Sequence, residues 1–168
     1  MKRNTLQSLS WGTTIFAALC GLVAFAMIFI TAIRTNSSSY SIFQSEYSGL
    51  QVALGCSTAG GHPIFNASAG LILAFAFPLL AACAAVMGKG FKAVAGVSAA
   101  AMIAGGALAL AGVSLLSPAI ELASASLGAG LIASGVLSLL GGAALCASIC
   151  VEVLMAKRDP ESEKPSEA

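Results

Sequence analysis

Charged residues are scarce in this chain of 168 residues. They make up 9% of it, whereas an ordinary soluble domain carries about 25%. The few that occur nearly balance, with eight lysines and arginines against seven aspartates and glutamates. The scarcity excludes an ordinary soluble domain. The balance excludes a strongly basic surface, so no nucleic-acid partner is expected.

Metal-binding and catalytic motifs are also missing. His62 is the only histidine, and no cysteine or aspartate lies beside it at a spacing that metal ligands use. The sequence has no Cys-x-x-Cys pair, phosphate-binding loop or nucleophile elbow. Glu152 is the only acidic residue within a long apolar stretch, and it lies near the end of that stretch, where it can reach the interface or pair with a basic residue. We therefore predict no catalytic residues, no cofactor and no metal, and a protein that is not an enzyme.

The five cysteines do not form a disulfide framework, because only Cys56 lies outside the apolar stretches. One cysteine cannot pair within its own chain, so no intrachain disulfide is expected, while a bridge from Cys56 to another subunit stays open. Cys146 and Cys150 are four residues apart and could contact a soft metal. They also continue a series of small residues described below, and we favour that interpretation.

What the chain does contain is four long apolar stretches, at residues 11–33, 69–87, 91–116 and 127–155. Each is near or above the roughly 20 residues with which a helix crosses the hydrocarbon core of a bilayer. The first is too long for the apolar region of a signal peptide, and Thr31–Arg34 is a poor cleavage site. The sequence thus predicts an all-α integral membrane protein. Residues 1–156 form a four-helix bundle with an extracytoplasmic segment at 34–68, and residues 157–168 form a disordered cytoplasmic tail.

The positive charges indicate the orientation. If the chain crosses four times, seven of the eight basic residues fall on one side of the membrane and only Arg34 on the other. The first group comprises Lys2, Arg3, Lys89, Lys92, Lys157, Arg158 and Lys164. The positive-inside rule then places both termini in the cytoplasm, with the protein in the plasma membrane.

The outer segment allows two structures. Leu50, Val52 and Leu54 alternate with smaller or polar residues, which is a weak strand signal, and Ser48-Gly49 is a plausible turn. These features predict a small hairpin. The alternative is an interfacial amphipathic helix built on Ile42, Phe43, Tyr47 and Leu50. The following residues, 57–63, are predicted to form a loop.

Small residues recur every four positions in the last two stretches. The third contains Gly96, Ala100 and Ala104, and the fourth contains Gly130, Ser134, Ser138 and Gly142, followed by Cys146 and Cys150. Positions four apart share one helix face, and small residues on it let helices approach closely within a bilayer. We predict that two smooth faces pack closely, either within the chain or against a partner. Pro78, inside the second stretch, is either a packing kink or a gating hinge.

The layout of four spans with a long first outer segment and a tight inner link resembles the claudin-like tetraspan arrangement. Gly49-Leu50 matches that family's outer signature, whereas its tryptophans and cysteine pair are absent. Residues Tyr47 to Gly55, followed by an apolar span, also resemble small four-span membrane proteins of Gram-positive bacteria. This resemblance implies a topology and no activity.

These observations predict a non-enzymatic membrane protein that acts as an accessory or assembly subunit, or as a self-associating scaffold. Its expected partners are the lipid bilayer and either a second copy or another membrane protein. The alternative is a pore or transporter for a neutral or apolar solute, which Pro78 and the glycine-rich third and fourth spans would serve through flexibility and room for a cavity.

Overall fold

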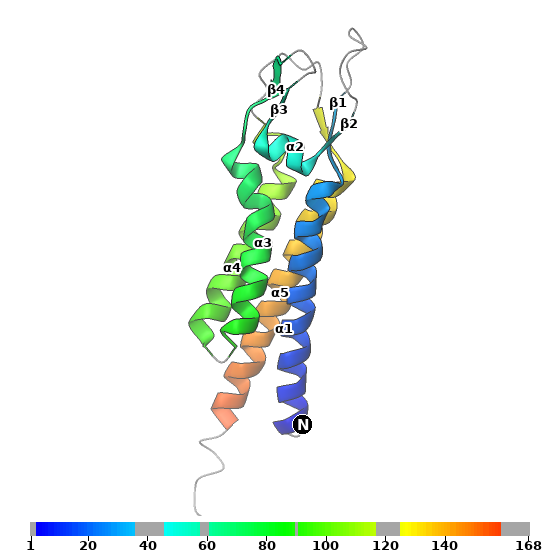
Figure 1. Ribbon diagram of the computed structural model, residues 1–168. Helices are drawn as coiled ribbons and strands as arrows, with labels where there is room; N and C mark the ends of the chain where they lie inside the picture. Colours follow the sequence, from blue (N-terminus) through cyan, green and yellow to red (C-terminus); the bar gives the residue numbers. More distant parts are fainter. Residues whose placement is uncertain (1–2, 36–45, 58–60, 90, 117–124, 159–168) are drawn as a thin grey trace, which may run out of the picture.

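The computed structural model describes residues 3–35, 46–57, 61–89, 91–116 and 125–158. Four long helices run side by side, and a small cap of strands and one short helix covers one end (Figure 1). The long helices are α1 (Arg3–Ala26), α3 (Ala69–Met87), α4 (Lys92–Leu110) and α5 (Ala129–Arg158), and a 3-10 turn, η1 (Met27–Phe29), extends α1. All four are long and apolar enough to cross a membrane, which confirms the predicted helical architecture.

Three of the four predicted spans have wrong limits, and the first helix already begins at Arg3 instead of at residue 11. The first was expected to reach residue 33, but the helical part ends at Phe29, and Thr31–Thr35 form strand β1. Apolar and β-branched residues suit a strand as well as a helix, and here strand pairing decides. The third helix ends at Leu110, followed by turns, instead of at 116. The fourth begins at Ala129 and continues to Arg158, so its last two residues belong to α5 instead of the predicted tail. The rest of that tail lies outside the described residues.

The helices form a ring in the order α1, α3, α4 and α5, each packed against its two neighbours. Around the middle of the bundle, the ring closes tightly on Pro78 of α3. A methyl group added at Gly21 of α1 would lie 2.5 Å from the Pro78 carbonyl oxygen, and one at Gly105 of α4 would lie 2.8 Å from Pro78 Cδ. Since lipid provides no hydrophobic drive between helices, such close backbone approach is what holds the bundle together.

The cap contains a three-stranded antiparallel sheet in the order β2-β1-β5. Strand β2 spans Glu46–Ser48 and β5 spans Ala125–Leu127. The central residue Ile33 of β1 lies opposite Tyr47 on one side and Leu127 on the other. A second antiparallel pair joins β3 (Cys56–Ser57) to β4 (Pro63–Phe65). Strand β1 follows directly from the first helix and β5 leads into the last, so the sheet ties the two together.

Between β2 and β3 lies the short helix α2 (Gly49–Leu54). The strand predicted for Leu50–Leu54 is therefore wrong. The helix begins at a complete capping box. The Ser48 hydroxyl accepts a hydrogen bond from the backbone N–H of Gln51, and the side-chain oxygen of Gln51 accepts one from the backbone N–H of Ser48. This local cap outweighs the alternating pattern. The predicted interfacial helix on Ile42, Phe43, Tyr47 and Leu50 is also wrong in its limits, since Tyr47 lies in β2; Ile42 and Phe43 lie outside the described residues.

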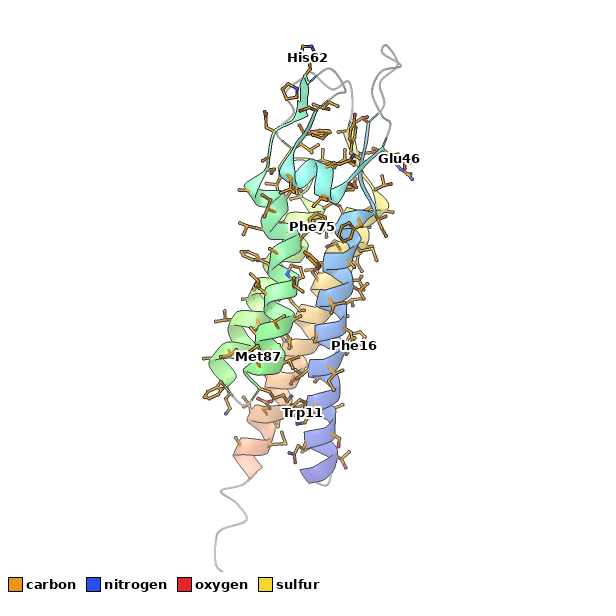
Figure 2. All side chains as sticks on the ribbon, viewed as in Figure 1. Trp11, Phe16, Glu46, His62, Phe75 and Met87 are labelled. Atoms are coloured by element: carbon orange, nitrogen blue, oxygen red, sulfur yellow. The ribbon has the colours of Figure 1, made fainter. Side chains whose placement is uncertain are left out.

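The cap and the bundle share one apolar core. Ile33, Tyr47, Val52 and Phe65 from the cap are buried together with Phe75 of α3. Figure 2 shows Phe75 near the end of the bundle that the cap covers. The Tyr47 and Phe65 rings meet edge to face, with centroids 5.0 Å apart. This geometry is a favourable aromatic contact. The cap is therefore packed on the end of the bundle as part of the same folded unit.

Candidate functional site

The small residues of α5 face the interior of the chain. Gly130, Ser134, Ser138 and Gly142 are all buried. A methyl group at Gly130 would lie 2.9 Å from the Met27 carbonyl oxygen, and one at Gly142 would lie 2.6 Å from Ile103 Cγ1, so the series packs against η1 and the start of β1 at one end and against α4 at the other. The Ser138 hydroxyl donates to the Ser134 carbonyl at 2.7 Å. Cys146 and Cys150, which were expected to continue the series, are exposed.

The small residues of α4 lie on the outside. Gly96, Ala100 and Ala104 are exposed, and a methyl group at Gly96 would find no atom within 4 Å. The buried face of this helix comprises other residues, namely Ser98, Ala99, Met102, Gly105, Gly106 and Ala109. The two predicted series therefore do not pack against each other. Small residues recur every four positions in both helices, but this spacing does not determine whether the face that carries them is buried.

We call the exposed small residues of α4 the α4 outer face; they are Ala93, Gly96, Ala100, Ala104 and Ala107. Val97, Ile103 and Leu110, with the flanking Phe91, add large exposed side chains near it. The outward surface of α1 is different, because it presents Ile15, Phe16, Leu19 and Leu22. Figure 2 shows Phe16 on the outside of that helix. Lipid chains fill the spaces around bulky side chains, whereas a smooth face suits another helix.

Pro78 is buried between two neighbouring helices. Its carbonyl faces Gly21 and its ring faces Gly105, with the Met102 side chain also next to Gly21. Contacts on both sides favour the packing role that was one of its two predicted roles. The gating hinge stays a prediction.

At the end of the bundle opposite the cap, Lys89 joins three elements. It lies in the link between α3 and α4, and its ammonium donates to the Ser10 carbonyl at 2.8 Å, the Ser10 hydroxyl at 2.9 Å and the Thr14 hydroxyl at 2.7 Å. Glu152 Oε1 of α5 lies 3.7 Å from the same nitrogen. The Trp11 ring centroid lies 4.8 Å away, within cation–π range. Figure 2 shows Trp11 at this end of the molecule.

Ser148 of α5 completes this cluster. Its hydroxyl lies 3.1 Å from the Ser10 hydroxyl and 3.2 Å from the Thr14 hydroxyl, and the Ser10 hydroxyl also donates to Glu152 Oε1 at 3.0 Å. We call Ser10, Thr14, Lys89, Ser148 and Glu152 the polar clasp. Glu152 was predicted to reach the interface or pair with a basic residue, and it pairs with Lys89. Residues on α1, the α3–α4 link and α5 are thereby held together by hydrogen bonds.

The clasp is nearly closed to its surroundings. The Lys89 and Glu152 side chains are 12% and 19% exposed. Burial lowers the pKa of Lys89, while the nearby Glu152 charge acts in the opposite direction. An ammonium has three protons to donate, and three acceptors surround this one, so the arrangement suits a structural tie better than a reactive amine.

Sequence reasoning used Lys89 only as one of the basic residues that indicate the orientation, and it missed the clasp. A signal was present, because Ser10 and Thr14 are four residues apart, as are Ser148 and Glu152, and each pair lies on one helix face near the same end of the bundle. What the sequence does not carry is that the two faces and the link meet.

Among the described residues, no group of three or more histidine, cysteine, aspartate or glutamate side chains is placed to hold a metal ion. His62, the residue considered for such a site, lies at the tip of the cap (Figure 2). No protein-family model, curated protein or solved structure matches the chain. Its function must therefore be argued from the placement of its own residues.

Proposed function

We propose that this protein is a non-enzymatic, multi-pass integral membrane protein that acts as an assembly subunit or self-associating scaffold, with the α4 outer face as its docking surface. The observation that supports this most directly is the outward placement of Gly96, Ala100 and Ala104. Of the comparable series on α5, Gly130, Ser134, Ser138 and Gly142 are buried within the chain, so the α4 series is the one whose glycine and alanines are exposed to a partner.

The physical reason is the nature of the solvent. In a bilayer, apolar side chains gain nothing by leaving lipid, so association depends on close packing and dispersion. The α4 outer face lets a second helix approach its backbone, which the bulky outer surface of α1 does not allow. Glycine and alanine also lose little side-chain entropy on contact.

The proposed location is the plasma membrane with both termini in the cytoplasm. Lys89 and Lys92 lie at the end of the bundle where α1 begins and α5 ends, whereas Arg34 lies in the cap. This asymmetry supports the orientation through the positive-inside rule.

The alternative of a pore or transporter needs a path between the helices. Around Pro78 the helices approach closely, and the side chain of Met102 is fully buried next to Gly21 and Gly141. This packing favours assembly over conduction. Flux of a neutral solute into proteoliposomes that contain the purified protein would instead favour the alternative.

The test introduces large side chains on the α4 outer face. Gly96 and Ala100 face open space, so the variant Gly96→Leu/Ala100→Leu should fold and lose its partner. Ala143→Leu/Ala147→Leu on the exposed side of α5 is the matched control. We would measure native mass in mild detergent and crosslinking in the membrane, and we expect the first variant to be monomeric and the control to behave as the parent.

An unchanged association state in the α4 variant would refute this docking surface, as would equal loss in both variants. The buried α5 residues Gly130 and Ser134 are unsuitable for this test, because bulk there would disturb the fold and would not report on assembly.

A further inference from the structure

Helix α2 is fixed at both ends to the limits of two long helices. The Gly49 amide donates to the Ile30 carbonyl at 3.2 Å, directly after η1 ends, and the Ser68 amide donates to the Ala53 carbonyl at 3.0 Å, directly before α3 begins. Six helical residues extend about 9 Å, which matches the usual separation of roughly 8–10 Å between packed helices. The short helix therefore lies across the seam between α1 and α3, between their ends (Figure 1).

The two sides of α2 differ in burial. Val52 and Ala53 are buried in the shared core of cap and bundle. Leu50 and Leu54, one helical turn apart, are 40% and 61% exposed. No residue of this helix is charged. Two leucines thus point outward from a helix held at the level where the apolar spans end.

The bundle also exposes apolar side chains at the ends of the two helices that α2 joins. Phe29 and Ile30, at the end of the α1 span, are exposed, as are Ile72 and Leu73 in the first turn of α3. By contrast, the cap carries its ion pair, Arg34–Glu46 at 3.1 Å, on exposed side chains of β1 and β2. The exposed ion pair of the cap thus lies on β1 and β2, whereas the exposed leucines lie on α2.

We propose that α2 is an interfacial lipid-binding element, and that Leu50 and Leu54 insert among the acyl chains of the leaflet at the cap end. The occupant is lipid because α2 is bonded to the residues directly after one candidate span and directly before another, so its exposed leucines lie at the boundary of the spans. An amphipathic helix at that level places its apolar side in the headgroup–acyl boundary. This inference rests on the membrane location proposed above. It goes further by fixing the cap against the bilayer surface.

The experiment is quenching of a single tryptophan by phospholipids brominated on the acyl chain. Trp11 is the only tryptophan, so Trp11→Phe provides the background for Leu54→Trp. Leu80→Trp, on the exposed side of α3, reports on the span itself, and His62→Trp, at the tip of the cap, reports on the aqueous side. The protein would be reconstituted in phosphatidylcholine vesicles with and without the brominated lipid.

We expect quenching at position 54 to be several-fold stronger than at position 62, and strongest with bromine near the carbonyl end of the chain. If position 80 is quenched and position 54 behaves like position 62, α2 does not insert and the inference is overturned. If position 80 is not quenched either, the membrane location itself fails. Leu50→Trp carries the same test should the substitution at Leu54 prevent folding.

Discussion

The close crossing at Pro78 predicts different effects for the same substitution at two positions of α1. Gly12 and Gly21 both lie within this helix. A methyl group at Gly12 meets no atom within 4 Å, whereas one at Gly21 would lie 2.5 Å from the Pro78 carbonyl oxygen and 2.6 Å from Met102 Cε. The methionine end can move aside, but the carbonyl belongs to the backbone of α3. Gly21→Ala must therefore push two helices apart.

The magnitude follows from comparing the two variants. Alanine in a helix interior is favoured over glycine by about 1 kcal/mol, and this gain applies to both and cancels in the difference. What is left is the cost of overpacking, typically about 1–3 kcal/mol. We expect Gly12→Ala to be neutral or slightly stabilising and Gly21→Ala to have a free energy of unfolding about 1–3 kcal/mol lower than Gly12→Ala.

The assay is unfolding of the purified protein in mixed micelles by added dodecyl sulfate, followed by far-ultraviolet circular dichroism. Both variants and the parent would be measured under the same conditions. If Gly21→Ala and Gly12→Ala agree within about 0.5 kcal/mol, the usual range of surface substitutions, then α1 does not contact α3 at Pro78 as described. The account of the closed ring would then be wrong.

Two further predictions concern the clasp and the cap. Lys89→Met leaves the Glu152 carboxylate without its cation, so we expect the free energy of unfolding to fall by about 3 kcal/mol. The double variant Lys89→Met/Glu152→Gln leaves no unpaired charge, so we expect it to recover part of this loss. A double variant that is no more stable than the single one would contradict this. Burial raises the pKa of Cys56, against a smaller lowering by the Phe65 backbone, so the folded state holds this proton more tightly than the unfolded state. The resulting stability is present below the unfolded thiol pKa and is lost as the pH rises through the folded value. Mass spectrometry of the Cys56 peptide after timed iodoacetamide treatment should show an alkylation midpoint at higher pH in native than in denatured protein, and equal midpoints would refute it.

The helical part of the fold could be read from the sequence because a run of about 20 apolar residues has few other structures open to it. Residues 69–87 were predicted with the limits that α3 has. The limits failed where apolar residues leave the bundle, as at Thr31–Ile33, because hydrophobicity alone does not separate the end of a span from a strand packed on it. The helix at Leu50 carried its own signal, the Ser48–Gln51 capping box, which outweighs two alternations of hydrophobicity.

The candidate site could be predicted only in part. Periodicity placed Gly96, Ala100 and Ala104 on one face, but burial of a face depends on how α4 is rotated about its axis, which local sequence does not determine. The position of Lys89 is harder still. Its acceptors lie on α1, far away in sequence, and its carboxylate partner lies on α5. Only the assembled ring brings them together.

The order of strands in the cap has a consequence for biosynthesis. Strand β1 pairs with β2 on one edge, and both are made early, but its other edge pairs with β5, which is made only after α4. A growing chain therefore keeps one edge of β1 open until the last crossing begins, and an open edge can pair with other chains. The sheet can close only on a chain that has already made α1, α3 and α4 in order. A nascent chain halted before Ala125 leaves this edge unpaired, which marks it as incomplete.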